Sequence, residues 1–258
     1  VAIKKLIGMF AFALYDEEEE KIYLVRDRLG IKPLYWGVFE GVLIFGSELK
    51  ALKKFPGWQP KIDRNSLSSF MRHNYIPAPH SIYKGVYKLE AGCYISMRKK
   101  NAIKKKRYWN LRDIAYSGVN QRKQNKDLLI ELDELLVDSV SRRMVSDVPI
   151  GSLLSGGIDS SLVTALMAES SSYKINTYTI GFEEKNYNEA PYAKDIAQHL
   201  GTNHTELYAK PEHAINLVDK IPYIYDEPFA DSSQIPTLLV CEMTKKHVSV
   251  VLTGDGGD

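Results

Sequence analysis

Hydrophobic residues in the first part of the chain occur in short apolar and aromatic runs separated by polar turns. The runs GMFAFALYD (residues 8–16) and IYLVRDR (22–28) flank the polar segment EEEEK (17–21), and this order predicts a strand, a turn and a second strand. Residues 42–45 predict another strand, which continues into a short helix capped near Ser47. We therefore expect an antiparallel sheet with few helices in this part.

From Asp127 onward the hydrophobic pattern becomes helical, and helices alternate with strands. One of these helices has a capping candidate, Asn188, before it and a terminating glycine, Gly201, after it. Alternation of this kind predicts a parallel sheet covered by helices on both faces, which binds ligands beyond the carboxyl ends of its strands. The expected helices cover residues 127–144, 158–170, 190–200 and 232–246, and the expected strands cover 148–154, 175–182 and 248–254.

The change of pattern places a domain boundary near residues 110–125, and we assign residues 1–115 to a first domain and 116–258 to a second. A strongly basic run, residues 98–109, precedes this boundary. It is either a solvated hairpin tip or a nucleic-acid patch. The solvated hairpin is favoured, because no aromatic or glycine pattern accompanies the positive charges.

Composition limits the class of protein. The chain has 258 residues, of which 44% are hydrophobic and 26% charged, as in ordinary globular proteins. The net charge of +2 implies no general affinity for nucleic acid, and no apolar run approaches the roughly 20 residues that a membrane span needs. Cys93 and Cys241 lie far apart and have no metal-ligand spacing, so we expect both to be reduced and buried in a cytoplasmic protein.

The stretch GSLLSGGIDSS (151–161) carries the first candidate chemistry. A strand is expected to end at Leu154 and a helix to begin near Ile158, which leaves Ser155, Gly156 and Gly157 in the connecting loop. Their N–H groups would converge at a helix N-terminus, where the helix dipole attracts anions, and glycine permits the close approach of a ligand.

The hydroxyls of Ser155, Ser160 and Ser161 can donate hydrogen bonds to phosphate oxygens. Asp159 repels phosphate unless a cation lies between them, which predicts Mg²⁺ together with a polyphosphate. The Walker signature and the G-x-S-x-G elbow are both absent, so Ser155 is a poor candidate for a hydrolase nucleophile. A plain capped strand-to-helix turn stays open as the alternative.

A second strand ends in a similar loop. VVLTGDGGD (250–258) would bring carboxylates to the same sheet edge as Asp159, where the two loops can share a cation. Between the two loops lies YDEPFADSSQIPT (225–237), which is dense in acids and hydroxyls just before a helix. Its alternative interpretation is an N-cap cluster formed by residues 231–233.

These motifs together resemble a known family. SGGIDSS resembles the pyrophosphate loop of ATP pyrophosphatases, and with DEPFADSSQIPT and LTGDGGD it resembles the synthetase domain of glutamine-hydrolysing asparagine synthetases. GMFAFALYD, LVRDRLGIKPLYWG, FGSELKAL and YIPAPHSIYKGVYKLEAG are similar to the later part of that family's N-terminal-nucleophile glutaminase domain, a type 2 glutamine amidotransferase. The resemblance implies an α+β antiparallel portion, followed by an α/β parallel-sheet, Rossmann-like ATP-pyrophosphatase domain.

The resemblance also implies a reaction and its residues. In this family ATP adenylates the side-chain carboxylate of aspartate with release of pyrophosphate, and ammonia from glutamine then displaces AMP to give asparagine. Asp159 and Asp258 would bind Mg²⁺, and Asp255 occupies the acidic position linked to forming the acyl-adenylate. The residues implied to bind ATP or pyrophosphate are Leu153, Ser155, Gly156, Gly157, Asp159, Ser160, Ile180, Thr253 and Gly254.

The chain departs from the family pattern at its start. The family's glutaminase nucleophile is a cysteine at the mature N-terminus, whereas this chain begins with Val1, and neither Cys93 nor Cys241 fits that role. The family's glutamine-binding residues lie upstream of the matched region. We therefore expect an internal segment of a longer protein that does not itself hydrolyse glutamine.

Alternative functions stay open. One is a sister enzyme that adenylates a carboxylate but closes a ring, such as a β-lactam synthetase or a lasso-peptide cyclase. Another is a non-catalytic nucleotide-binding or scaffolding protein, which three retained carboxylates beside a phosphate loop argue against. The expected small-molecule partners are aspartate, ATP, and glutamine or ammonia, and the candidate assembly is a homodimer. We expect no membrane or nucleic-acid partner. The near-neutral charge also disfavours a tRNA-modifying pyrophosphatase.

Overall fold

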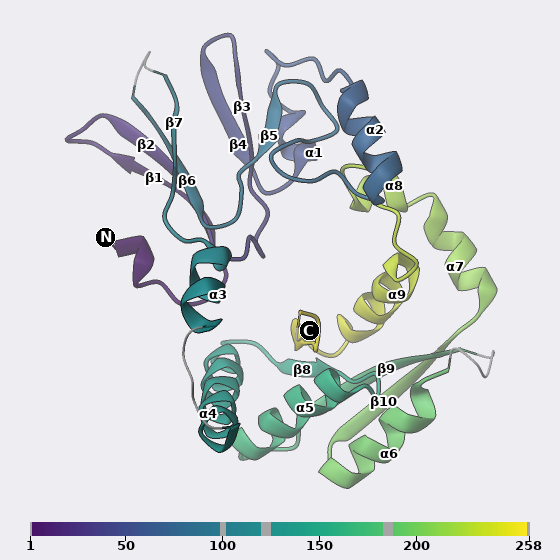
Figure 1. Ribbon diagram of the computed structural model, residues 1–258. Coiled ribbons are helices and arrows are strands. Elements are labelled where there is room, and N and C mark those ends of the chain that lie inside the picture. Colours follow the sequence, from purple (N-terminus) through teal and green to yellow (C-terminus); the bar gives the residue numbers. More distant parts are fainter. Residues whose placement is uncertain (1, 99–101, 120–124, 183–187, 257–258) are drawn as a thin grey trace. The chain divides into compact units, whose positions relative to one another are not determined.

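The computed structural model describes the whole chain except residues 1, 99–101, 120–124, 183–187 and 257–258. The chain forms two compact units, each described here by itself (Figure 1). Unit 1 comprises Val1–Arg122 together with Ile221–Asp231, and unit 2 comprises Lys123–Lys220 together with Ser232–Asp258. A short segment from the second half of the sequence is therefore part of unit 1.

Unit 1 contains antiparallel strands, as predicted, but they form two separate sheets with the orders β1-β2-β6-β7 and β4-β3-β5. The sequence analysis did not predict β3 or the helices α2 and α3. The elements are a 3₁₀ turn (Ala2–Lys4), β1 (Ala11–Asp16), β2 (Lys21–Arg26), β3 (Tyr35–Phe39), β4 (Val42–Gly46), α1 (Leu49–Leu52), α2 (Arg64–His73), β5 (Val86–Lys88), β6 (Cys93–Arg98), β7 (Lys104–Arg107), α3 (Leu111–Val119) and α8 (Ile221–Ile224).

Two apolar clusters form the core of unit 1. Leu24, Leu89 and Ile95 belong to the cluster beneath the β1-β2-β6-β7 sheet, and Leu49 and Trp58 belong to the cluster beside β3. The edge strand β7 has the sequence KKKR, and all of its residues are exposed. Charged side chains on an edge strand prevent pairing with another chain, so the described part of the basic run has a structural explanation.

Unit 2 contains a four-stranded parallel sheet in the order β10-β9-β8-β11, as the alternating pattern predicts. β10 and α7 were not predicted. The elements are α4 (Asn125–Arg143), β8 (Ile150–Leu153), α5 (Ile158–Ser170), β9 (Asn176–Phe182), α6 (Ala190–Leu200), β10 (Asn203–Ala209), α7 (Pro211–Val218), α9 (Gln234–Thr244) and β11 (Val250–Leu252).

Helices cover both faces of this sheet (Figure 1). On one face, Tyr178 of β9 packs with Val240 and Met243 of α9. On the other face, Leu154 packs against Ala193 and Ala197 of α6. The strands are therefore covered on both faces. Because β8 and β11 are parallel, the loops that follow them emerge at the same edge of the sheet.

Helix ends differ in detail from the prediction. Glu189, rather than Asn188, occupies the N-cap of α6, although Asn188 Oδ1 accepts a hydrogen bond from Ala190 N at 3.2 Å. Gly201 ends that helix with a φ of 68°, as expected of a terminating glycine. Ser233 occupies the N-cap of α9, and its side chain makes no capping hydrogen bond.

None of the helices in the described ranges is long and apolar enough to cross a lipid bilayer.

Candidate nucleotide site

A buried hydroxyl pair joins β8 to α5 and sets the position of the loop between them. Ser152 and Thr164 are both 0% exposed, and their hydroxyl oxygens lie 2.8 Å apart. The Thr164 hydroxyl also donates to Ser160 O at 2.7 Å. Because both hydroxyls are satisfied inside the unit, the strand and helix are held together at the point where the chain turns.

Gly156 fits the loop because it has no side chain. Its φ is +88°, which favours glycine, and an added Cβ would lie 2.8 Å from Tyr192 Cβ and 3.0 Å from Ala193 N. Gly156 therefore lets the loop pack against α6. It is not among the residues that line the cavity described below, so its contribution to a ligand site is indirect.

Hydroxyl groups organise the rest of the loop. The Ser155 and Ser160 hydroxyl oxygens lie 2.9 Å apart, and Ser155 N donates to Ser160 Oγ at 3.2 Å. Gly157 N donates to Ser155 Oγ at 3.2 Å. The Ser155 and Gly157 amides, which were predicted to converge on a ligand, thus donate to hydroxyl groups that can rotate away. The amides of Ile158, Asp159 and Ser160 belong to the first turn of α5, where a helix offers them no acceptor of its own.

The loop after β11 lies directly against that first turn. A Cβ at Gly254 would lie 2.6 Å from Ser160 N and 2.9 Å from Asp159 Cβ, so only glycine allows this approach. In the same loop Thr253 Oγ1 donates to Asp255 Oδ2 at 3.0 Å and accepts from Asp255 N at 3.2 Å. The predicted glycine loop and the predicted aspartate loop therefore form one site.

A cavity of about 550 Å³ opens at this edge of the sheet. Of the predicted site residues that the structure describes, all except Gly156 and Ser161 line it; the Ser161 hydroxyl donates to Gly157 O at 2.6 Å, and Asp258 lies outside the described residues. Asp159 and Asp255 contribute carboxylates to its lining, and Leu153 and Ile180 contribute apolar side chains. The lining residues are Leu153, Leu154, Ser155, Gly157, Asp159, Ser160, Tyr178, Thr179, Ile180, Phe182, Glu189, Pro236, Thr237, Val240, Cys241, Val251, Thr253, Gly254, Asp255 and Gly256.

One face of α9 forms a wall of this cavity that the sequence analysis missed. Pro236, Thr237, Val240 and Cys241 recur at helical spacing and line the cavity together. The prediction that Cys241 is buried is wrong, because its side chain is exposed, whereas Cys93 is buried as predicted. Partial desolvation by neighbouring atoms raises the pKa of both thiols, although the Cys241 side chain stays accessible to solvent, so both favour the protonated form at neutral pH.

The donor set suits Mg²⁺ only together with a ligand. Asp159 and Asp255 supply the hard carboxylate oxygens that Mg²⁺ prefers. Within the described ranges, however, no group of three or more His, Cys, Asp or Glu side chains is arranged to hold a metal ion. Phosphate oxygens of a bound nucleotide would complete the coordination, as is usual for Mg²⁺ in nucleotide sites.

Parallel strands that end in a glycine- and serine-rich loop at a helix start define unit 2 as an α/β protein of the nucleotide-binding type. The family models agree with this class: asparagine synthase matches residues 131–258, and the glutamine amidotransferase domain matches residues 1–109. The chain belongs to the family of glutamine-hydrolysing asparagine synthetases. The domain boundary at residues 115/116 and the individual site residues stay predictions.

Curated relatives carry the same family name. The chain is 42% identical to a putative asparagine synthetase [glutamine-hydrolyzing] 2 of Methanocaldococcus jannaschii, over 99% of this chain and 49% of the relative. It is 35% identical to asparagine synthetase [glutamine-hydrolyzing] 1 of Bacillus subtilis, over 100% of this chain and 40% of the relative. The chain thus spans half or less of the length of these relatives.

Among solved structures, an NMN synthetase from Francisella tularensis is 15% identical, with a TM-score of 0.36 over 47% of this chain and 52% of that chain. This likeness is too weak to support a statement about the fold.

Proposed function

We propose that unit 2 binds ATP in the cavity between the loops after β8 and β11, with the phosphates at the first turn of α5. The close approach of Gly254 to Asp159 and Ser160 carries this proposal, because it joins two separate motifs into one site. The amides of the first helical turn and the helix dipole favour a polyphosphate there, and Leu153 and Ile180 provide apolar surface for adenosine.

In the whole protein, this site would catalyse the ATP-dependent amidation of aspartate. An oxygen of the aspartate β-carboxylate attacks the α-phosphorus of ATP, and the bond to pyrophosphate breaks, which gives β-aspartyl-AMP. Ammonia, released from glutamine by the amidotransferase part, attacks the acyl carbon; AMP leaves with the bonding electron pair, and ammonia loses a proton to give asparagine. Making a mixed anhydride supplies the leaving group that a free carboxylate lacks.

Individual residues have distinct roles in this proposal. Ser155 and Ser160 can turn their hydroxyls from each other toward phosphate oxygens. Asp159, with Asp258, would hold Mg²⁺, which neutralises phosphate charge when bound. Asp255 would act where the acyl-adenylate forms, and its position in the lining of the same cavity as the glycine loop supports this role.

The test of the site is ATP binding by this chain, measured calorimetrically with and without Mg²⁺. We expect Asp159→Asn to weaken Mg²⁺-dependent ATP binding by about ten-fold or more, the size of one lost charge-assisted contact. The matched control is Asp138→Asn on α4, an exposed carboxylate that pairs with Arg142. Equal affinity for Asp159→Asn and wild type would contradict the role of Asp159.

Alkylation of Cys241 locates the bound nucleotide. In a Cys93→Ser background, ATP should slow the reaction of Cys241 with iodoacetamide, because Cys241 lines the cavity. Unchanged labelling at saturating ATP would place the nucleotide elsewhere. In the full-length protein, pyrophosphate release that depends on aspartate, and not on other carboxylates, separates asparagine synthesis from ring-closing sister enzymes.

A further inference from the structure

Two threonines of β9 lie on the same face of the sheet of unit 2. Thr177 is paired in register with Ser152 of β8, whose hydroxyl meets Thr164 of α5, so α5 covers this face. Side chains two residues apart on a strand point the same way, so Thr179 lies on this face as well. Tyr178, between the two threonines, points to the opposite face and packs against α9.

The two threonines differ in their hydrogen bonding. Thr177 is 0% exposed, and its hydroxyl oxygen lies 2.9 Å from both Thr202 Oγ1 and His204 Nδ1. Thr179 is only 4% exposed, and within the described part of the chain its hydroxyl makes no hydrogen bond. Buried hydroxyl groups in folded proteins normally have a partner, so the Thr179 hydroxyl needs an explanation.

The Thr179 oxygen has access to the cavity. Among the residues that the structure describes, His204 Nε2 is the one buried side-chain atom that is closed to solvent and also lacks a partner. The Thr179 oxygen lacks a partner but is not closed off in this way, and Thr179 lines the cavity. Its hydroxyl is therefore a nearly buried polar group that faces the space where a ligand would bind.

Other buried hydroxyl groups in the described part of unit 2 have partners within the protein. They belong to Ser152, Ser160, Thr164, Thr177 and Thr244. A buried hydroxyl without a partner lowers stability, because it gives up hydrogen bonds to water and gains none in return. An unpaired hydroxyl at the cavity is therefore best explained by a ligand that pairs with it when bound.

The face of the sheet indicates which part of a nucleotide the Thr179 hydroxyl would meet. Leu153 and Ile180, which we place beside adenosine, pack into the cluster under α9. Thr179 lies on the other face, where α5 begins after the loop that contains Ser155 and Gly157. Ionised phosphate oxygens only accept hydrogen bonds, which suits a hydroxyl whose proton is free to be donated.

We propose that Thr179 is a nucleotide-binding residue whose hydroxyl donates a hydrogen bond to an oxygen of the bound polyphosphate. This inference rests on the proposed function, because it needs ATP in the cavity. It adds a contact from β9 to those proposed for the loop after β8, so two adjacent strands would hold the phosphates. No motif marks Thr179, since it lies inside a strand and not in a loop.

The experiment compares Thr179→Val with wild type in calorimetric titrations with ATP in the presence of Mg²⁺, and measures pyrophosphate affinity by its competition with ATP. Valine has nearly the shape of threonine but no hydroxyl. We expect the affinities for ATP and for pyrophosphate each to fall about ten-fold, the size of one hydrogen bond to a charged group. Thr179→Ser keeps the hydroxyl and should restore most of both affinities.

The matched control is Thr177→Val, which removes a hydroxyl from the same strand and the same face, but one that the protein itself satisfies. Thr177→Val should lower the urea midpoint and leave the ATP affinity of the folded protein close to that of wild type. Thr179→Val should not lower the midpoint, because its hydroxyl has no protein partner to lose. A lower midpoint in Thr179→Val would overturn the premise that this hydroxyl is unpaired.

The remaining outcomes separate this inference from the proposed function. Unchanged ATP affinity in Thr179→Val, with normal binding by wild type, would overturn the role of Thr179 and leave the proposed function standing. A loss for ATP without a loss for pyrophosphate, or an equal loss in Thr177→Val, would overturn the phosphate contact. Failure of wild type to bind ATP would overturn the proposed function and this inference together.

Discussion

Gly254 illustrates how one residue decides the geometry of the site. The space that a side chain would occupy is filled by the backbone of Asp159 and Ser160, the nearest atom lying 2.6 Å from the Cβ position. Backbone atoms cannot move aside as the end of a flexible side chain can. A methyl group there would push the loop after β11 away from the first turn of α5 and separate Asp255 from Asp159.

We predict that Gly254→Ala lowers the free energy of unfolding by about 1–3 kcal/mol, the usual cost of overpacking, and weakens ATP binding. Urea denaturation and calorimetric titration measure the two effects. Gly118→Ala is the control, because no atom lies within 4 Å of its Cβ position and its backbone is helical. Equal stability of wild type and Gly254→Ala would mean that the two loops are not in contact in solution.

At the scale of elements, the buried pair of Ser152 and Thr164 connects β8 to α5. Thr164→Val should cost about 1–3 kcal/mol of stability, because the Ser152 hydroxyl is left buried without this partner. The double variant Ser152→Ala/Thr164→Val should cost less than the sum of the single variants, as expected for groups in direct contact. Urea denaturation of the four proteins measures this coupling, and strictly additive costs would rule it out.

Several elements were predictable because their signals are local. The strands of β1 and β2, the helices α5 and α6, and the glycine that ends α6 follow from hydrophobic period and turn residues. β3 and β10 were missed, since their burial depends on neighbouring strands; in β10, His204 and Glu206 are only partly buried and give no alternating apolar signal.

At the scale of the whole molecule, His204 links stability to pH. Its Nδ1 lies 2.9 Å from Thr177 Oγ1, and its buried Nε2 has no hydrogen-bond partner among the residues the structure describes. Burial lowers the pKa of His204 below its ordinary value of 6.5, an effect that Glu206 opposes and Lys194 reinforces. The unfolded chain therefore binds a proton more readily than the folded chain.

We predict that the stability contributed by keeping His204 neutral in the folded chain is complete above pH 6.5 and is lost as the pH falls below that value. The urea midpoint of wild type should fall between pH 7.5 and pH 5.5, and His204→Gln should reduce that fall. His199→Gln, an exposed histidine of α6, is the control and should leave the slope unchanged. An identical slope in His204→Gln and wild type would show that His204 is not responsible.

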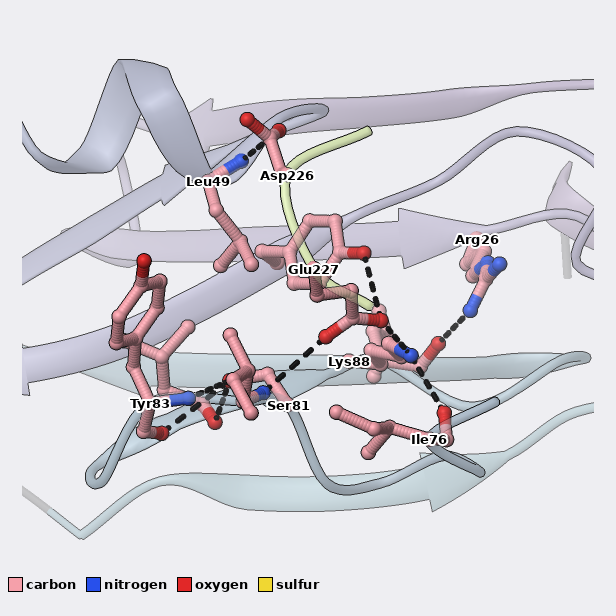
Figure 2. Close-up of polar contacts among 12 residues, drawn as sticks. Arg26, Leu49, Ile76, Ser81, Tyr83, Lys88, Asp226 and Glu227 are labelled. Atoms are coloured by element: carbon pink, nitrogen blue, oxygen red, sulfur yellow. Dashed lines mark hydrogen bonds and ion pairs between the residues drawn. The ribbon is translucent and has the colours of Figure 1, made fainter. Parts of the chain in front are cut away.

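The assembly of unit 1 is also a property of the whole molecule. Asp226 accepts a hydrogen bond from Leu49 N at 2.6 Å and so supplies the cap of α1 that the sequence analysis assigned to Ser47 (Figure 2). No local pattern connects positions so far apart in sequence. The acids of YDEPF were interpreted with the helix that follows them, whereas their hydrogen-bond partners are Leu49, Ile82 and Lys88.

The sequence by itself determined the kind of sheet in each unit, the two loops that meet at the site, and the family, because period, turn residues and short motifs are properties of neighbouring residues. Only the tertiary structure decided which surfaces face the cavity: it turned Gly156 toward α6, exposed Cys241 and joined Glu227 to Lys88. Those outcomes depend on contacts between residues that are distant in the chain, and such contacts contribute to stability only after each unit has packed.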